Sequence, residues 1–122
     1  MKILVIEDSK AMRMIILRTL RQAGYTQHAV GEASNATEAL QIMQKWVPDL
    51  ILCDWNMPGM TGIQLLEKLR IARCQIKFGF ITSELMPHLR KWATDAGALF
   101  VLPKPFSVDD IRAAIEPLLK KP

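Results

Sequence analysis

Polar residues of the kinds that perform chemistry follow four short apolar runs of the sequence: Glu7 with Asp8, then Asp54, Thr82 and Lys104. The runs are rich in Ile, Leu, Val and Phe, a composition typical of strands that are buried on both faces of a sheet. The carboxyl ends of parallel strands meet at one edge of a sheet, and ligands of open α/β sheets bind there. We therefore expect three carboxylates, one hydroxyl and one ammonium group to converge at one edge.

Carboxylates that lie close together repel one another, and this repulsion raises a pKa unless a cation intervenes. Lys104 supplies one positive charge, so a divalent metal ion is the natural addition. The candidate ligands are oxygens, without histidine or thiolate, and this favours Mg²⁺ or Mn²⁺ over Zn²⁺. Mg²⁺ held by a few carboxylates commonly serves phosphate chemistry. The residues therefore predict phosphoryl transfer, with Asp54 as the candidate nucleophile.

The elements that must position these residues alternate between strands and amphipathic helices. We predict strands over 2–6, 28–33, 50–54, 77–82 and 99–102, and helices over 9–23, 35–47, 61–72, 87–96 and 107–118. This alternation is typical of an α/β fold with a parallel sheet, helices on both faces and right-handed crossovers. The length of 122 residues suits one domain, 1–122.

Local signals define the helix ends. Two capping boxes are predicted: Asn35 with Glu38, and Thr61 with Gln64. Pro87 is expected in the first turn of the fourth helix, and Pro117 is expected to kink or fray the last helix. The first helix should bury an apolar stripe made of Met12, Ile15, Ile16, Leu20 and Ala23.

The composition limits the classes of function. The formal charge is +4, and setting aside the four charged residues of the expected site leaves 15 bases and 9 acids, or +6. A basic surface can steer nucleic acid, but the charges are spread along the chain without a nucleic-acid motif, which favours a solvated surface.

No apolar run approaches the roughly 20 residues of a membrane span. An early acid and two unpaired cysteines, Cys53 and Cys74, predict a cytoplasmic protein with free thiols.

Longer motifs resemble a known family, the response-regulator receiver domains of two-component signalling, and the likeness is greatest to the stand-alone CheY-like members. It covers the whole chain, and the motifs stand in the family's order and spacing: Glu7-Asp8-Ser9 with Met12-Arg13, Asp54-Trp55-Asn56-Met57-Pro58-Gly59-Met60-Thr61-Gly62, Thr82-Ser83-Glu84, Ala96-Gly97-Ala98 and Lys104-Pro105-Phe106. The resemblance implies a flavodoxin-like (βα)5 fold with strand order 2-1-3-4-5.

The resemblance also implies a chemical role for each site residue. Asp54 would accept a phosphoryl group from a phosphohistidine of a sensor histidine kinase or phosphotransfer domain. Mg²⁺ would be held by Asp8, Asp54 and the backbone carbonyl of Asn56, with Glu7 acting mainly through water. The catalysis is limited to the domain's own phosphotransfer and autodephosphorylation.

On the phosphoryl side, the resemblance implies that Lys104 pairs with the phosphoryl group, that Thr82 donates to it, and that the Lys104–Pro105 bond is cis. Asn56 and Glu84 occupy the positions that tune hydrolysis of the acyl phosphate in the family, and we expect a short-lived phosphoryl group.

The resemblance implies a switch, in which Thr82 moves toward the phosphoryl group and the fourth helix, fifth strand and fifth helix rearrange for a downstream protein target. The family usually has Tyr or Phe where this chain has Val101. Phe100 cannot replace it, because adjacent strand residues point to opposite faces. The output is therefore expected to be weaker, or to use other side chains such as Trp92. We expect Pro103 to stiffen the loop before Lys104.

A partner face is also implied. Met14 and Leu17 fall outside the buried stripe of the first helix, among Lys10, Arg13, Arg18 and Arg21. These residues are either a solvated face or a docking patch for the helices of the kinase, which the family binds there. The domain would be a monomer or a weak dimer.

Other functions remain open on the same fold. A degenerate receiver would bind proteins without being phosphorylated, and the chain could be the receiver of a longer regulator. A phosphatase with an aspartyl nucleophile would need a second aspartate where Asn56 stands, and a flavin or nucleotide protein would need a phosphate-binding glycine loop after the first strand.

Overall fold

The computed structural model describes residues 1–25, 29–83 and 86–119. The strands are β1 (Ile3–Ile6), β2 (Val30–Ala33), β3 (Leu50–Asp54), β4 (Lys77–Thr82) and β5 (Phe100–Pro103); the helices are α1 (Lys10–Gln22), α2 (Ala36–Met43), α3 (Gly62–Ile71), α4 (Leu89–Asp95) and α5 (Val108–Leu119). The strands form one parallel sheet in the order β2-β1-β3-β4-β5. The predicted fold class and strand order are confirmed.

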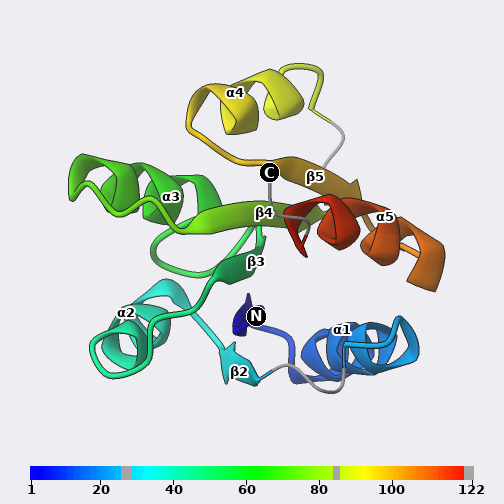
Figure 1. The fold of residues 1–122 in the computed structure, drawn as a ribbon. Helices are drawn as coiled ribbons and strands as arrows, with labels where there is room; N and C mark the ends of the chain where they lie inside the picture. The colour runs from blue at the N-terminus through cyan, green and yellow to red at the C-terminus, as the bar shows by residue number, and fades with distance from the viewer. Residues whose placement is uncertain (26–28, 84–85, 120–122) are drawn as a thin grey trace.

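Helices cover both faces of the sheet, as Figure 1 shows, with α1 and α5 on one side and α2, α3 and α4 on the other. Alternate residues of β1 therefore enter different cores: Leu4 and Ile6 pack toward α2, α3 and α4, whereas Ile3 and Val5 pack toward α1 and α5. Because both faces are covered, every residue of β1 and β3 is buried. This burial explains their continuous apolar sequences.

The helix starts follow the predicted caps with one difference. Thr61 and Gln64 form a complete capping box at the start of α3. At α2, Asn35 accepts from the Glu38 backbone as predicted. The Glu38 carboxylate, however, accepts from the backbone and hydroxyl of Ser34 instead of from Asn35. The capping box predicted for Asn35 and Glu38 is therefore only half formed.

Two further sequence expectations differ from the structure. Pro87 lies before α4, which begins at Leu89 with His88 as its N-cap residue. Ile15 is 48% exposed, and Thr19 is buried on α1 in its place. Pro117 lies inside α5, close to its last residue Leu119, and its effect on the helix stays a prediction. None of the described helices has both the length and the apolar character needed to cross a membrane.

The edge strand β5 is shifted by one residue from its predicted range. Pro103 is its last residue, rather than part of the following loop, and pairs in register with Thr82. A proline is tolerated here because an edge strand needs no outward hydrogen bond from that nitrogen. Phe100 packs toward α1 and α5, whereas Val101 packs toward α4, as the alternation of strand side chains predicted.

The ring of Phe100 occupies the space above Gly79, its register partner on β4. A methyl group added at Gly79 would overlap that ring. We expect Gly79→Ala to lower the free energy of unfolding by roughly 1–3 kcal/mol. Phe100→Leu should cost less in the Gly79→Ala background than in the wild type, because the smaller side chain relieves the overlap. Urea unfolding of the four proteins measures this coupling, and strictly additive losses would contradict it.

Candidate functional site

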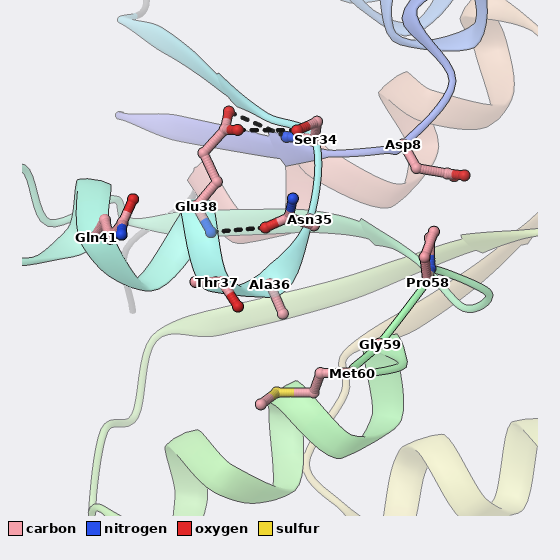
Figure 2. A pocket seen from close by; sticks show the side chains of 10 residues that line it. All are labelled: Asp8, Ser34, Asn35, Ala36, Thr37, Glu38, Gln41, Pro58, Gly59 and Met60. Carbon is pink, nitrogen blue, oxygen red and sulfur yellow. Dashed lines mark hydrogen bonds between the residues drawn. The ribbon is translucent and has the colours of Figure 1, made fainter.

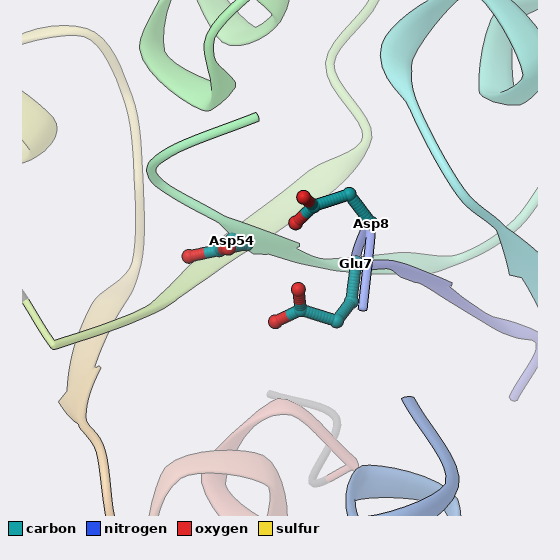
Figure 3. Close-up of side chains that lie close together, drawn as sticks. All are labelled: Glu7, Asp8 and Asp54. Atoms are coloured by element: carbon teal, nitrogen blue, oxygen red, sulfur yellow. The ribbon is translucent and has the colours of Figure 1, made fainter. Parts of the chain in front are cut away.

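Three carboxylates gather at the carboxyl edge of the sheet. Glu7 and Asp8 follow β1, and Asp54 ends the neighbouring strand β3. Figure 3 shows them side by side, and one ligand oxygen from each lies within 4.8 Å of the other two. Glu7 and Asp54 are buried, whereas Asp8 is exposed. The three carboxylates therefore converge as predicted, and an all-oxygen donor set of this kind fits a hard divalent cation.

The backbone around Asp54 is fixed from two sides. The Trp55 N–H donates to the carbonyl of Ile81 at 3.3 Å, and the Gly62 N–H donates to the carbonyl of Trp55 at 3.0 Å. A side chain at Gly62 would overlap the carbonyl oxygen of Asp54 and the ring of Phe80. Gly62 therefore lets the start of α3 approach the end of β3 closely.

The ring of Trp55 anchors the residue that follows Asp54. Trp55 is 4% exposed and packs against Phe80, with ring centroids 4.8 Å apart. It also meets Trp92 of α4 edge-on at 5.4 Å. Trp92 is half exposed. Aromatic contact thus runs from the residue beside Asp54 to the surface of α4.

Lys104 lies between two of the carboxylates. Its Nζ is 2.7 Å from Glu7 Oε1 and 3.4 Å from Asp54 Oδ1, and its side chain is largely buried. Its backbone N–H donates to the carbonyl of Thr82 at 2.8 Å, which joins the ends of β4 and β5. The Lys104–Pro105 bond is cis, as the resemblance implied. The ammonium group therefore belongs to the acidic cluster.

Glu7 is occupied by protein groups at both carboxylate oxygens. Oε1 accepts from Lys104, and Oε2 accepts from the backbone N–H of Ser9 at 3.1 Å. Asp8, by contrast, reaches solvent beside Asp54. Of the three acids, Asp8 and Asp54 therefore have the oxygens best placed to meet a cation directly.

Burial raises the pKa of Asp54 from 3.8 to about 6. Lys104 opposes this rise in pKa by its charge and by its hydrogen bond to the carboxylate, whereas the charge of Glu7 adds to the rise. The backbone N–H of Asn56 also opposes the rise. Burial also raises the pKa of the Cys53 thiol, and the charges of Asp54 and Glu7 raise it further. Cys53 is therefore an unreactive thiol. For Asp54, the ammonium group of Lys104 only partly offsets the cost of burying the carboxylate.

The other predicted site residues lie around this cluster. Thr82 is buried at the end of β4, next to β3. Asn56 is exposed in the loop after Asp54. Val101 is buried and, with Thr82 and Leu89, lines a hollow of about 210 Å³ between α4 and β5. Glu84 lies outside the described residues.

Two arginines near the site make contacts that the sequence analysis did not predict. Arg13 donates to the carbonyl of Glu7 at 2.8 Å, and Arg90 donates to the carbonyl of Val101 at 3.1 Å. Arg13 belongs to a family motif, which is a sequence signal for its importance but not for its contact. The contact of Arg90 had no sequence signal, because its partner comes from a different element.

The acidic cluster borders an open hollow of about 710 Å³. Figure 2 shows Asp8 on one wall, the start of α2 with Asn35 and Thr37 on another, and Pro58 to Met60 on a third. The walls are uncharged apart from Asp8 and Glu38, whose carboxylate is held by Ser34. The hollow leaves room for an incoming group beside Asp8, the acid of the cluster that lines it.

Comparisons with known proteins agree with this geometry. The profile described as response regulator receiver domain matches residues 3–116. The chain is 31% identical to Sporulation initiation phosphotransferase F of Bacillus subtilis, over 97% of this chain and 93% of that protein. It is 35% identical to Chemotaxis protein CheY of Pseudomonas aeruginosa, over 99% of this chain and 98% of that protein. The solved structure of CheY4 of Vibrio cholerae matches at 30% identity with a TM-score of 0.82, over 97% and 98% of the two chains.

The raised pKa of Asp54 predicts how stability depends on pH. The carboxyl of Asp54 binds its proton more tightly in the folded than in the unfolded state, so its ionisation lowers the free energy of unfolding. This loss is complete above about pH 6 and disappears near pH 4. Without metal, Asp54→Asn should raise the free energy of unfolding at pH 7.5 by about 1–3 kcal/mol. This gain should shrink toward zero as the pH falls to 4.

Urea unfolding in the presence of a chelator measures this difference across the pH range. Asp109→Asn is the control, because the Asp109 side chain is 91% exposed on α5. A gain for Asp54→Asn that is the same at pH 4 and pH 7.5, or a loss at pH 7.5, would contradict the prediction.

Proposed function

The chain belongs to the response regulator receiver family, and we propose that residues 1–122 form a receiver domain that accepts a phosphoryl group on Asp54. The observation that carries this proposal is the meeting of Asp54 with Asp8, Glu7 and Lys104 at one edge of the sheet. Phosphoryl transfer depends on positioning and on neutralising charge, and this cluster supplies both.

Mg²⁺, or Mn²⁺ in its place, would be held by the carboxylates of Asp8 and Asp54 and by the backbone carbonyl of Asn56. Glu7 would support the site through water and through its contact with Lys104. When bound, the cation neutralises the carboxylates and orients the phosphoryl oxygens. An all-oxygen donor set within 4.8 Å supports this assignment.

The chain's own residues carry the transfer. One oxygen of Asp54 attacks the phosphorus, and the new O–P bond forms as the P–N bond of a phosphohistidine breaks, with its electron pair leaving on the imidazole. The ammonium group of Lys104, 3.4 Å from Asp54, then pairs with the phosphoryl group. The Thr82 hydroxyl donates to another phosphoryl oxygen. A pKa of about 6 leaves Asp54 mostly ionised, and so nucleophilic, at neutral pH.

The same site would remove the phosphoryl group by hydrolysis. Asn56 and Glu84 occupy the two positions that we propose set the rate at which water reaches the acyl phosphate. The domain would thus catalyse only its own phosphorylation and dephosphorylation, and act otherwise as a signalling protein.

The phosphodonor would be a sensor histidine kinase or a phosphotransfer domain in the cytoplasm, docked on α1. Met14 is 55% exposed on this helix, whereas Leu17, contrary to the sequence prediction, is partly buried against the core. Both line a hollow of about 410 Å³, together with Lys10, Arg13, Arg18, Arg21 and Glu32. Apolar side chains ringed by bases fit an amphipathic partner helix with acidic flanks.

The output surface would be α4, β5 and α5, presented to a downstream protein by a monomer or weak dimer. Phosphorylation adds a charge of about −1.5 to −2, and Thr82 would respond to it. The hollow beside Val101 is the space into which this switch can collapse. Val101 is smaller than the usual aromatic residue, which favours a weaker output or one that uses Trp92, in contact with Trp55.

A small phosphodonor such as acetyl phosphate tests the chemistry without a kinase. We expect phosphate to be incorporated in the presence of Mg²⁺, and the incorporation to disappear with a chelator or with Asp54→Asn, because the nucleophile and the charge neutralisation are then missing. Asp109→Asn should behave as the wild type does. Intact-protein mass spectrometry measures the modification, and equal incorporation in Asp54→Asn would reject Asp54 as the acceptor.

A further inference from the structure

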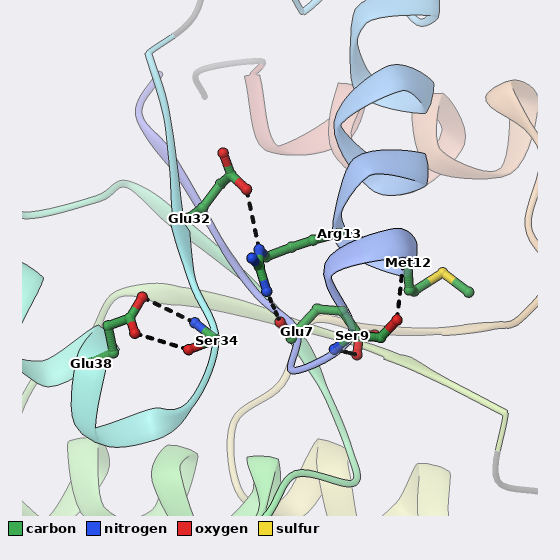
Figure 4. Close-up of polar contacts among 7 residues, drawn as sticks. All are labelled: Glu7, Ser9, Met12, Arg13, Glu32, Ser34 and Glu38. Carbon is green, nitrogen blue, oxygen red and sulfur yellow. Dashed lines mark hydrogen bonds and ion pairs between the residues drawn. The ribbon is translucent and has the colours of Figure 1, made fainter.

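Arg13 joins the acidic turn after β1 to the edge strand β2. Its Nη1 donates to the backbone carbonyl of Glu7 at 2.8 Å, and its Nε pairs with Glu32 Oε1 at 3.1 Å (Figure 4). The side chain of Arg13 is 16% exposed, whereas that of Glu32 is 47% exposed. One guanidinium group therefore connects α1, the acidic turn and β2.

The carbonyl that Arg13 holds belongs to the peptide unit between Glu7 and Asp8. Because a peptide unit is planar and rigid, fixing the direction of this carbonyl also fixes where the Asp8 Cα lies, and so the point from which the Asp8 side chain leaves the backbone. The neighbouring contacts act on other atoms: the Glu7 N–H donates to Ala33, and the Ser9 N–H donates to the Glu7 carboxylate. Among the hydrogen bonds described for this turn, the one from Arg13 acts on the peptide that orients Asp8.

We propose that Arg13, itself oriented by Glu32, is a positioning residue that aims the Asp8 carboxylate at the cation site beside Asp54. This inference rests on the proposed function, because the cation is the one that the receiver would use. It concerns a residue to which the proposed function assigns a place on the docking face but no part at the cation site. A guanidinium group suits the task because its N–H groups diverge in a fixed plane and can serve a carbonyl and a carboxylate together.

Simple electrostatics makes the opposite prediction, which gives the inference a sharp test. Removing a positive charge near a cation site should tighten binding of the cation, since like charges repel. If Arg13 positions Asp8, removing it should instead weaken the binding. The sign of the change therefore separates the two effects.

The test is a titration of the metal-free protein with Mg²⁺, followed by tryptophan fluorescence at a fixed ionic strength. We expect Arg13→Gln to raise the dissociation constant roughly tenfold, the lower end of the range for residues that orient metal ligands. Arg13→Lys keeps the positive charge but lacks the planar set of diverging N–H groups, so its dissociation constant should lie between those of the wild type and Arg13→Gln. Lys68→Gln is the matched control, because it removes one charge from an exposed site on α3 and should change the constant less than twofold.

Glu32 provides an independent arm with a milder change. Glu32→Gln leaves Arg13 in place but weakens its orientation, so we expect the dissociation constant to rise about two- to threefold. Combined with Arg13→Gln it should add nothing, because the two residues act through one contact. Urea unfolding of each variant shows whether the protein still folds. If Arg13→Gln does not fold, Arg13→Lys and Glu32→Gln still test the inference.

Mg²⁺ binding by Arg13→Gln that is as tight as in the wild type, or tighter, would overturn the inference. So would full restoration by Arg13→Lys, because the planar fork of the guanidinium group would then not be what positions Asp8. In both cases the wild type would still bind Mg²⁺ and accept phosphate, and the proposed function would stand. Absence of Mg²⁺ binding by the wild type would reject the proposed function and this inference together.

Discussion

The ammonium group of Lys104 between the carboxylates of Glu7 and Asp54 is the interaction on which the site depends. It lies 2.7 Å from one and 3.4 Å from the other, in a largely buried position. Burial keeps the pKa of Asp54 raised to about 6, because the charge and hydrogen bond of Lys104 only partly offset the cost of burying this carboxylate and the charge of Glu7 adds to that cost. A further cation at this edge of the sheet would reduce the cost.

The rest of the fold brings these charges together and keeps them there. Parallel strands in the order 2-1-3-4-5 place β1 beside β3, so that Asp8 and Asp54 are neighbours although they are far apart in sequence. Gly62 lets α3 close on the backbone of Asp54, and the Lys104 backbone is bonded to that of Thr82 across β4 and β5. The site is thus held by backbone contacts from several elements.

Much of this arrangement follows from the sequence because it is local. Apolar runs that end in polar residues predicted the strand ends, and the pairing of Thr61 with Gln64 predicted a cap that the structure confirms. The errors arose where a competing contact or the packing of a helix decides. Glu38 bonds the nearby Ser34 instead of completing its box, and Thr19 rather than Ile15 is buried on α1. The partner of Arg13 comes from another element, so its contact could not be read from spacing, and only the resemblance supplied the strand order.

The release of protons on Mg²⁺ binding tests the central claim most directly, because it measures how far the pKa of Asp54 is raised before the cation binds. Isothermal titration in two buffers that differ in ionisation enthalpy gives the number of protons released per ion bound. With the pKa of Asp54 at about 6 in the metal-free protein, the account predicts about half a proton released at pH 6 and close to none at pH 8. Binding that releases no proton at pH 6, or no binding at either pH, would contradict it.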